Sequence, residues 1–269
     1  MRKSKKSKSF PVFVSIASNK GRARTINEDN FYADILGIRE IPDLCGHRVL
    51  NHSDRYIFGV CDGMGGEQFG DTASEIAVGT MREFSDRIKK SELKDLHNAV
   101  NEYAREANRR ICHMAWERSA DMSGSTFVIV CVRGGMVYPF SMGDSRIYFR
   151  TGSELHQISE DQTVAAKKRR DNIYSEEEAR LSSDAHKITT FLGVDSENIG
   201  LKALACEPLD LSRGEVLLCS DGLTDMCTDK EILWVMQKCG DEFAAQHLVE
   251  LALKNGGADN VTCMIIRKA

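Results

Sequence analysis

Apolar, strand-like runs that end in an aspartate recur along this chain. The run Tyr56–Cys61 is followed by Asp62, and glycine occupies three of the next four positions. The run Glu215–Cys219 leads in the same way to the pair Asp221-Gly222. A turn explains each aspartate–glycine pair taken singly, because both residues favour turns. The recurrence constrains the fold further, since several buried strands must end at tips that carry carboxylates.

Short runs rich in Val, Ile, Phe and Tyr predict seven β-strands. The pair Gly134-Gly135 predicts a hairpin turn between two of them. Because the strands come in hairpin-like groups and the helices in pairs, the order differs from the strict alternation of a parallel α/β sheet. We therefore predict an α+β fold in which helices cover the faces of antiparallel sheets. The predicted strands span 12–17, 56–61, 126–132, 136–141, 146–150, 215–219 and 261–267.

Apolar residues recur with helical spacing in four segments. Two of them, 71–89 and 92–120, lie between the first strands and the hairpin, and two more, 229–238 and 241–254, lie near the end. Each long segment has one apolar stripe and should therefore lie on a sheet or on its partner helix. The pair Gly256-Gly257 predicts the end of the last helix.

Two segments differ from this pattern. Residues 161–187 are polar and charged, which predicts an insertion or mobile flap with short helices around 163–169 and 176–181. The first ten residues hold five basic side chains and no acid, which predicts a flexible basic tail. We predict a tail at 1–10 and a single domain at 11–269, with the flap subdomain at about 161–187.

Charge and cysteine usage narrow the function classes. The net charge is −4, so the chain without the five positive charges of its tail carries −9, which argues against a nucleic-acid partner. None of the nine cysteines forms a CxxC pair, and those in strand-like runs are typical of buried hydrophobes in a reduced protein. No stretch has the length of a membrane-spanning helix, and no signal peptide is visible. We expect a cytoplasmic protein and, by default, a monomer.

Further acids stand at strand ends. Asp144 lies between two predicted strands, Asp259 precedes the last one, and Glu28 and Asp29 precede a short apolar run. Strand tips at one edge of a core converge, and converging carboxylates repel unless cations balance them. Oxygen ligands select Mg²⁺ or Mn²⁺ over Zn²⁺. These turns are therefore interpreted as turns built around metal.

Two metal ions about 3.5–4 Å apart are a known device for phosphate ester hydrolysis, and phosphate needs a cationic partner. Arg24 lies four residues before Glu28, and its planar fork matches phosphate geometry. Taken alone, it would be interpreted as a solvated surface charge. The seven histidines show no ligand spacing such as HExxH, and we interpret His113, His186 and His247 as ordinary surface or core residues.

Eight short motifs follow one another along the chain: "GRARTINEDN", "VCDGMGGEQFGDTAS", "SGSTFVIV", "MGDSRIY", "ISEDQT", "ITTFLG", "LLCSDGLTD" and "GADNVT". Together they resemble the metal-dependent serine/threonine phosphatase family called PPM or type 2C, and "DGMGG" is similar to its bacterial branch. The motifs run from residue 21 to residue 262. The resemblance implies a four-layer αββα sandwich of two antiparallel sheets flanked by helix pairs.

The resemblance also implies a site. Asp62 would bridge two Mn²⁺ or Mg²⁺ ions, and the two ions would activate a water that hydrolyses phosphoserine and phosphothreonine. The substrates would be phosphorylated proteins made by a serine/threonine kinase. The 161–187 segment matches the family's flap, where substrate choice is influenced. The remaining implied roles are metal binding by the Gly63 carbonyl, Asp221 and Asp259, water-mediated metal contacts from Glu28 and Asp29, a third, weaker ion at Asp144 and Asp221, phosphate binding by Arg24, and support from Ser220 and Asn260.

The chain departs from the family pattern at Met64, where many members carry a histidine that is a candidate general acid, at Glu67, and in "TTFLG". The first alternative is a catalytically weak regulatory binding protein of the same fold. A hydrolase that uses a covalent aspartate is disfavoured because no DxDx[TV] arrangement is present. A nucleotide-binding loop is disfavoured because "GMGGEQFG" does not complete GxGxxG.

Overall fold

The apolar run before Asp62 forms β4 (Arg55–Met64), an interior strand of its sheet in this computed structural model. Alternate side chains of β4 face different layers, so that Ile57 packs against the helices and Phe58 packs against the other sheet. A sheet covered on both faces needs apolar residues at consecutive positions. That is why the run is continuously apolar. The structure describes residues 9–34, 44–65, 69–120, 122–194, 201–239 and 242–269.

All strand pairs described are antiparallel, as predicted. The six-stranded sheet has the order β3 (Leu44–Leu50), β1 (Val12–Asn19), β13 (Val261–Lys268), β12 (Glu215–Cys219), β8 (Arg146–Thr151) and β9 (Glu154–Gln157). The seven-stranded sheet has the order β10 (Leu204–Ala205), β7 (Met136–Met142), β6 (Phe127–Arg133), β4 and β2 (Asp29–Ala33), with β11 (Leu209–Asp210) on β7 and β5 (Gly124–Ser125) on β4.

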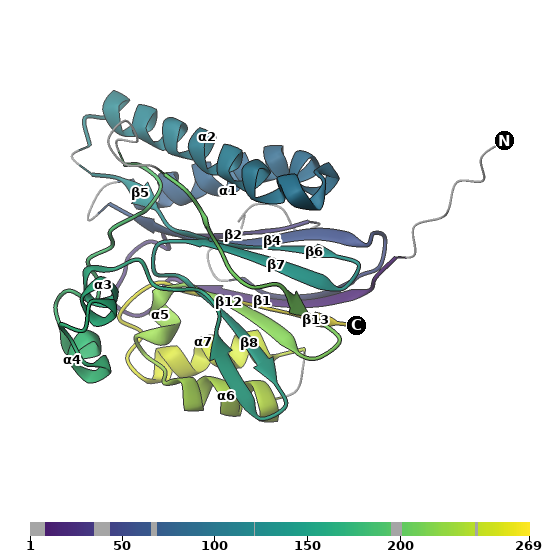
Figure 1. Ribbon diagram of the computed structural model, residues 1–269. Coiled ribbons are helices and arrows are strands. Elements are labelled where there is room, and N and C mark those ends of the chain that lie inside the picture. Colours follow the sequence, from purple (N-terminus) through teal and green to yellow (C-terminus); the bar gives the residue numbers. More distant parts are fainter. Residues whose placement is uncertain (1–8, 35–43, 66–68, 121, 195–200, 240–241) are drawn as a thin grey trace.

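Helices cover the outer face of each sheet, which confirms the predicted four-layer αββα sandwich (Figure 1). Helices α1 (Gly70–Lys90) and α2 (Leu96–Glu117) bury their apolar stripes against the β4 sheet. Helices α6 (Asp229–Lys238) and α7 (Ala244–Lys254) do so against the other sheet. The short helix α5 (Asp221–Thr224) follows β12 directly.

The inner faces of the two sheets form the central core. On β1, β4 and β12 the even-numbered residues point between the sheets, including Ile16, Phe58 and Leu218. These side chains are fully buried. Burial of a large aliphatic or aromatic side chain stabilises the fold by about 1.5–3 kcal/mol. The same alternation fixes where the residues at the ends of these strands must point.

The 161–187 segment forms α3 (Val164–Arg170) and α4 (Glu176–Leu181), close to the predicted short helices. In Figure 1 the two helices pack together beside the end of the sandwich that carries α5. The predicted 1–10 tail lies almost wholly outside the described residues, and the division into tail, domain and flap remains a prediction. Within the described ranges, no helix combines the length and apolarity needed to cross a membrane.

Two predicted helix boundaries were wrong. The segment predicted as one helix over 92–120 begins with a 3₁₀ turn, Leu93–Asp95, and its α-helix ends at Glu117. The last helix, predicted from 241, begins at Ala244 after Phe243, and residue 241 lies outside the described part of the chain. Turn geometry at helix ends causes such shifts, because apolar spacing continues through a turn.

Candidate metal centre

The inner faces of the sheets change from apolar to polar at one end of the sandwich. On each contributing strand, the residue that continues the inward-facing series is a hydroxyl or a carboxylate. Each of these residues is buried or partly buried, and they come from segments far apart in the chain. The alternation that builds the core therefore also gathers one polar cluster. Its members are Ser18, Asp29, Asp62, Thr126, Ser145, Ser220 and Thr262.

Asp29 and Asp62 lie directly opposite each other on β2 and β4. Side chains in such a pair share one face of the sheet, and like charges there destabilise it. Burial raises the pKa of Asp62 well above its usual range, and the charges of Asp29 and Asp221 raise it further. Burial also raises the pKa of Asp29 to about 7, although a hydrogen bond from Ser220 Oγ to its Oδ2 (2.6 Å) opposes the rise. The pair is held together by the fold against its own repulsion.

Asp221 enters the cluster from the other sheet, at the start of α5. Burial raises its pKa to about 6, and the charges of Asp225 and Asp259 add to the effect. The charge of Asp221 also acts on the pKa of Asp62, so the two carboxyl groups lie near each other although they come from different sheets. The two apolar runs that end in aspartate therefore bring their carboxylates to the same end of the sandwich.

Asn260 fixes the loop that carries Glu28. Its Nδ2 donates to the carbonyls of Lys20 and Ile26, both at 2.9 Å, and its Oδ1 accepts from the Glu28 backbone N–H at 2.7 Å. The carbonyl of Glu28 accepts in turn from the Gly63 N–H at 3.1 Å. Burial raises the pKa of the Glu28 carboxyl, and the positive charge of Arg24 partly opposes this rise. Glu28 is therefore tied to the β4 tip and to the segment that leads into β13.

Arg24 lies at the open side of the cluster. Its Nη2 donates to Asp259 Oδ2 at 2.7 Å, and its side chain is 44% exposed. Hydrogen bonding to Asp259 raises the pKa of the guanidinium, and the charges of Glu28 and Asp221 act in the same direction. The predicted phosphate-binding residue thus stands at the mouth of the acidic cluster.

Asp144 lies in the turn between β7 and β8 and is 93% buried, since its relative exposure is 7%. Burial raises its pKa well above the usual range, with further contributions from Asp221 and Asp161. Its Oδ1 has no hydrogen-bond partner in the part of the chain that the structure describes. The neighbouring Ser145 is held by Thr126, at 2.7 Å between hydroxyl oxygens, and Thr126 also accepts from the Asp62 N–H.

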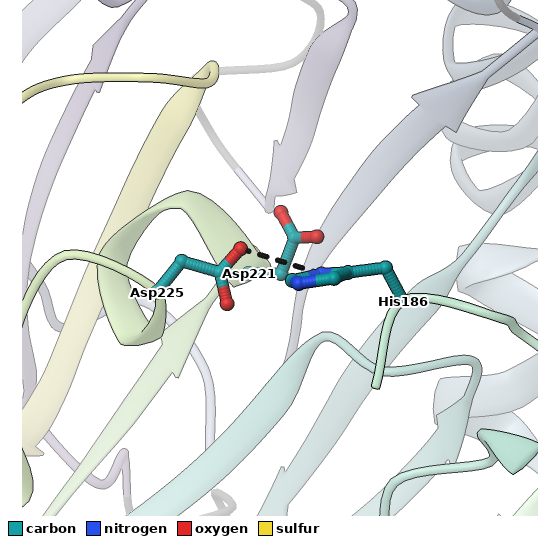
Figure 2. A group of neighbouring side chains, drawn as sticks. All are labelled: His186, Asp221 and Asp225. Carbon is teal, nitrogen blue, oxygen red and sulfur yellow. Dashed lines mark ion pairs between the residues drawn. The ribbon is translucent and has the colours of Figure 1, made fainter. Parts of the chain in front are cut away.

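Two residues that the sequence analysis did not assign to the site lie at its edge. His186, interpreted as an ordinary surface or core histidine, lies with Asp221 and Asp225 in a group whose ligand atoms are all within 4.8 Å of one another (Figure 2). Asp225 follows Asp221 by four residues, a helical spacing that puts both on one face and was the available signal. His186 is distant in sequence and had no such signal.

The donor set fits hard divalent cations. The facing carboxylates, Asp29 and Asp62, need positive charge between the sheets, and the buried Oδ1 of Asp144 lacks a donor among the described residues. Carboxylate oxygens in this number favour Mg²⁺ or Mn²⁺. Raised pKa values at several neighbouring acids are also typical of functional sites.

Comparisons with known proteins agree with this geometry. The family model described as protein phosphatase 2C matches residues 43–252, which is well over half of the chain. The chain belongs to the protein phosphatase 2C family. It is 28% identical over 265 residues to the serine/threonine phosphatase stp of Listeria welshimeri, covering 96% of each chain.

Solved structures of family members superpose on nearly the whole chain. The catalytic domain of the phosphatase PstP, in complex with two manganese ions, has a TM-score of 0.74 at 27% identity and covers 96% of this chain and 98% of that one. Stp1 from Staphylococcus aureus has a TM-score of 0.79 at 25% identity and covers 95% and 94%. The sequence-based assignment to the family and to its fold is therefore confirmed.

Gly63 offers a test of how tightly the family's β4 tip is packed. A Cβ at this position would lie 2.1 Å from the carbonyl oxygen of Gly70 and 2.6 Å from that of Glu28. We expect Gly63→Ala to lower the free energy of unfolding by about 3 kcal/mol, measured by urea denaturation. Gly79→Ala is the control, because its Cβ would meet nothing within 4 Å on helix α1. The control should gain about 0.5–1 kcal/mol of stability, and equal effects would refute the close approach.

Proposed function

We propose that this chain is a metal-dependent phosphoprotein phosphatase that hydrolyses phosphoserine and phosphothreonine. The observation that carries the proposal is the convergence of carboxylates from both sheets, the buried Asp29 and the partly buried Asp62 and Asp221, beside an exposed arginine at one end of the sandwich. Membership of the protein phosphatase 2C family supports it. The names of relatives as serine/threonine phosphatases support the same substrate class.

The residues proposed to hold a pair of Mn²⁺ or Mg²⁺ ions are those that the family resemblance implies. When bound, the two ions supply Lewis-acid activation of the attacking water and neutralise charge on the phosphate oxygens. Ser220 would orient the Asp29 carboxylate through its 2.6 Å hydrogen bond. Met64 carries no ionisable proton at neutral pH, so it cannot protonate the leaving oxygen. The proposed ligands are Asp62, the Gly63 carbonyl, Asp221 and Asp259, with Glu28 and Asp29 acting through water and Asp144 at a third, weaker ion.

Arg24 is proposed to bind the phosphate. Its side chain is nearly half exposed while it donates to Asp259, so its fork is accessible from solvent. We expect Arg24→Ala to raise the KM for a phosphothreonine peptide about 10- to 100-fold, because a charge-assisted hydrogen bond contributes about 1.5–3 kcal/mol. Arg22→Ala removes an exposed guanidinium two residues away and serves as control. An unchanged KM in Arg24→Ala would exclude a phosphate contact.

The proposed substrates are phosphorylated proteins made by a serine/threonine kinase, which implies a role in signalling. The test is hydrolysis of phosphoserine, phosphothreonine and phosphotyrosine peptides and of an aryl phosphate during Mn²⁺ and Mg²⁺ titration. We expect metal-dependent release of phosphate from the first two peptides. Absence of release from every substrate at saturating metal would refute the proposal. That result, with metal binding retained, would favour the regulatory binding protein of the same fold, for which no observation speaks so far.

A further inference from the structure

A basic cavity lies at the end of the sandwich opposite the acidic cluster. Its volume is about 390 Å³, which is within the roughly 300–1,000 Å³ typical of small-molecule sites. One end each of β8, β12 and β13 and the turn before β12 form its walls. We call this cavity the distal pocket, and the residues that give it its chemical character are Arg150, Ser212, Arg213, Glu215, Arg267 and Lys268.

Strand direction separates the distal pocket from the acidic cluster. Strand β12 begins at Glu215 in the pocket, and Ser220 and Asp221 follow its other end. Strand β13 follows Asn260 directly and ends at Lys268 in the pocket. Because an antiparallel strand rises about 3.4 Å per residue, the 8 residues of β13 extend over about 27 Å. Figure 1 shows the chain end marked C, which follows β13, at the opposite end of the sandwich from α5. The distal pocket is therefore separate from the candidate metal centre.

Positive charge prevails in the distal pocket. Four of the lining side chains are cationic, and Glu215 is the one acid among them. Arg150 Nε donates to Glu215 Oε1 at 2.5 Å, so these two charges compensate each other in the pocket wall. Asp210 lies beside the pocket, where the charges of Arg213 and Lys268 act on it. Even with Asp210 included, four cations meet two carboxylates, on a chain whose net charge is −4.

Two of the four cations are held in fixed positions. Arg150 Nη1 donates to the Gly152 carbonyl at 2.9 Å, in addition to the ion pair with Glu215. The Arg267 guanidinium lies 4.3 Å from the centroid of the Phe13 ring. A cation–π contact of this kind fixes the guanidinium plane and leaves the N–H groups at its edge able to donate. An anion that enters the pocket therefore meets donors that are already placed, which lowers the entropy cost of binding.

We propose that the distal pocket binds a small soluble anion that carries phosphate groups, of the class of a diphosphate. Arginine and lysine side chains recognise phosphate oxygens by charge-assisted hydrogen bonds, and the Ser212 hydroxyl is a further donor in the wall. A cavity lined by one sign of charge also raises the local concentration of ligands of opposite sign. The excess of two positive charges matches an anion with two or more negative charges. This inference goes beyond the proposed function and holds whether or not the chain hydrolyses phosphopeptides.

The test is calorimetric titration of the full chain with inorganic pyrophosphate, in EDTA and at about 0.15 M salt. Without metal, the acidic cluster repels anions, so saturable binding reports on the distal pocket. We expect Arg213→Ala combined with Lys268→Ala to weaken binding about 10-fold or more, because charge-assisted hydrogen bonds are lost. Both side chains are exposed, so this double variant should unfold at the same urea concentration as the wild type.

Lys230→Ala combined with Lys254→Ala is the matched control, because it removes two exposed positive charges on α6 and α7. This pair, and Arg24→Ala at the mouth of the acidic cluster, should bind pyrophosphate as the wild type does. No saturable binding in the wild type, or equal weakening in the two double variants, would overturn the proposal. Loss of binding in Arg24→Ala would also overturn it, because the anion would then lie at the metal centre.

Hydrogen exchange of the wild type gives a readout that needs no variant. Pyrophosphate should slow amide exchange in peptides that cover 209–216 and 264–269, and it should leave peptides from 20–30 unchanged. Unchanged exchange in the first two peptides would contradict binding in the distal pocket.

A lipid headgroup carries the same phosphate chemistry, so a second arm measures cosedimentation with phosphatidylcholine vesicles that contain phosphatidylglycerol. We expect the variant with Arg213→Ala and Lys268→Ala to cosediment to the same extent as the wild type, because the pocket takes a soluble ligand. Cosedimentation lost in that variant and kept in the lysine control, without pyrophosphate binding in solution, would overturn the assignment to a soluble anion.

Discussion

Asp62→Asn is expected to lower Mn²⁺-dependent phosphopeptide hydrolysis by about 10³-fold while making the metal-free protein more stable. The loss follows from the position of Asp62, whose carboxyl interacts with those of Asp29, Asp221, Asp144 and Asp259. Asp62 thus faces carboxyl groups from both sheets. Removing one preorganised electrostatic contact in an active site typically costs about 10²–10³-fold, and a ligand shared by two ions stands at the upper end.

The gain in stability has the same origin. Burial and neighbouring charges raise the pKa of Asp62 well above its usual range, so its ionised form opposes folding at neutral pH. An asparagine keeps the shape and removes the charge. We expect a higher melting temperature in chelator and a smaller increase on adding Mn²⁺, measured by thermal unfolding.

Asp86→Asn is the control for this experiment, because Asp86 is an exposed acid on α1 paired with Lys90. It should leave both the rate and the response to Mn²⁺ unchanged. If Asp62→Asn unfolds at a lower temperature than the wild type in chelator, the carboxylate cluster is not repulsive as inferred. If it keeps wild-type activity, Asp62 does not hold the metal.

Secondary structure was predicted accurately from the sequence where the apolar pattern of a strand or helix was uninterrupted. Strand β12, for which Glu215–Cys219 was predicted, and helix α6, for which 229–238 was predicted, have those bounds in the structure. Strands β2 and β3 were not predicted. In β2 the polar residues Asp29 and Asn30 interrupt the apolar run, because they belong to the functional end of the sheet. Local patterns fail where a strand carries residues for a site as well as for the core.

The candidate site was predictable to the extent that strand ends mark it. Asp62, Asp221 and Asp259 each adjoin an apolar run, and a strand tip is a position that sequence reveals. The flap contains no apolar run that would identify its site residues in this way. His186 lies in a turn whose place is set by Asp184 and its two lysine partners, and those contacts arise only in the folded chain. A single sequence shows neither which face the flap turns inward nor what it meets there.

Metal-free protein should lose stability as pH rises from about 5 to 8, and Mn²⁺ should reverse this trend. The folded protein holds Asp29 at a pKa of about 7 and Asp221 at about 6. An aspartate in the unfolded chain has a pKa of about 3.9. A raised folded pKa means that the folded state binds the proton more tightly. The stabilisation is therefore fully present below pH 4 and is lost as pH rises through 6 and 7.

Bound metal reverses the direction in which stability changes with pH, because the metal binds the same oxygens only after they lose their protons. Each unit of pKa shift corresponds to about 1.4 kcal/mol, so the two acids together affect stability by on the order of a few kcal/mol. The measurement is urea unfolding at several pH values from 5 to 8, in EDTA and in saturating Mn²⁺. We expect the two curves to diverge as pH rises. The free energy of unfolding should fall in EDTA and rise in Mn²⁺.

The difference between the two curves isolates the metal centre, because ionisable groups far from it contribute equally in EDTA and in Mn²⁺. Asp29→Asn should flatten the EDTA curve between pH 6 and 8, since it removes the acid whose pKa lies there. Asp86→Asn, on the surface of α1, should leave both curves unchanged. Parallel curves in EDTA and Mn²⁺ would mean that protons and metal do not compete for one set of carboxylates. In that case the acids at the end of the sandwich would not form a metal centre, whatever their proximity.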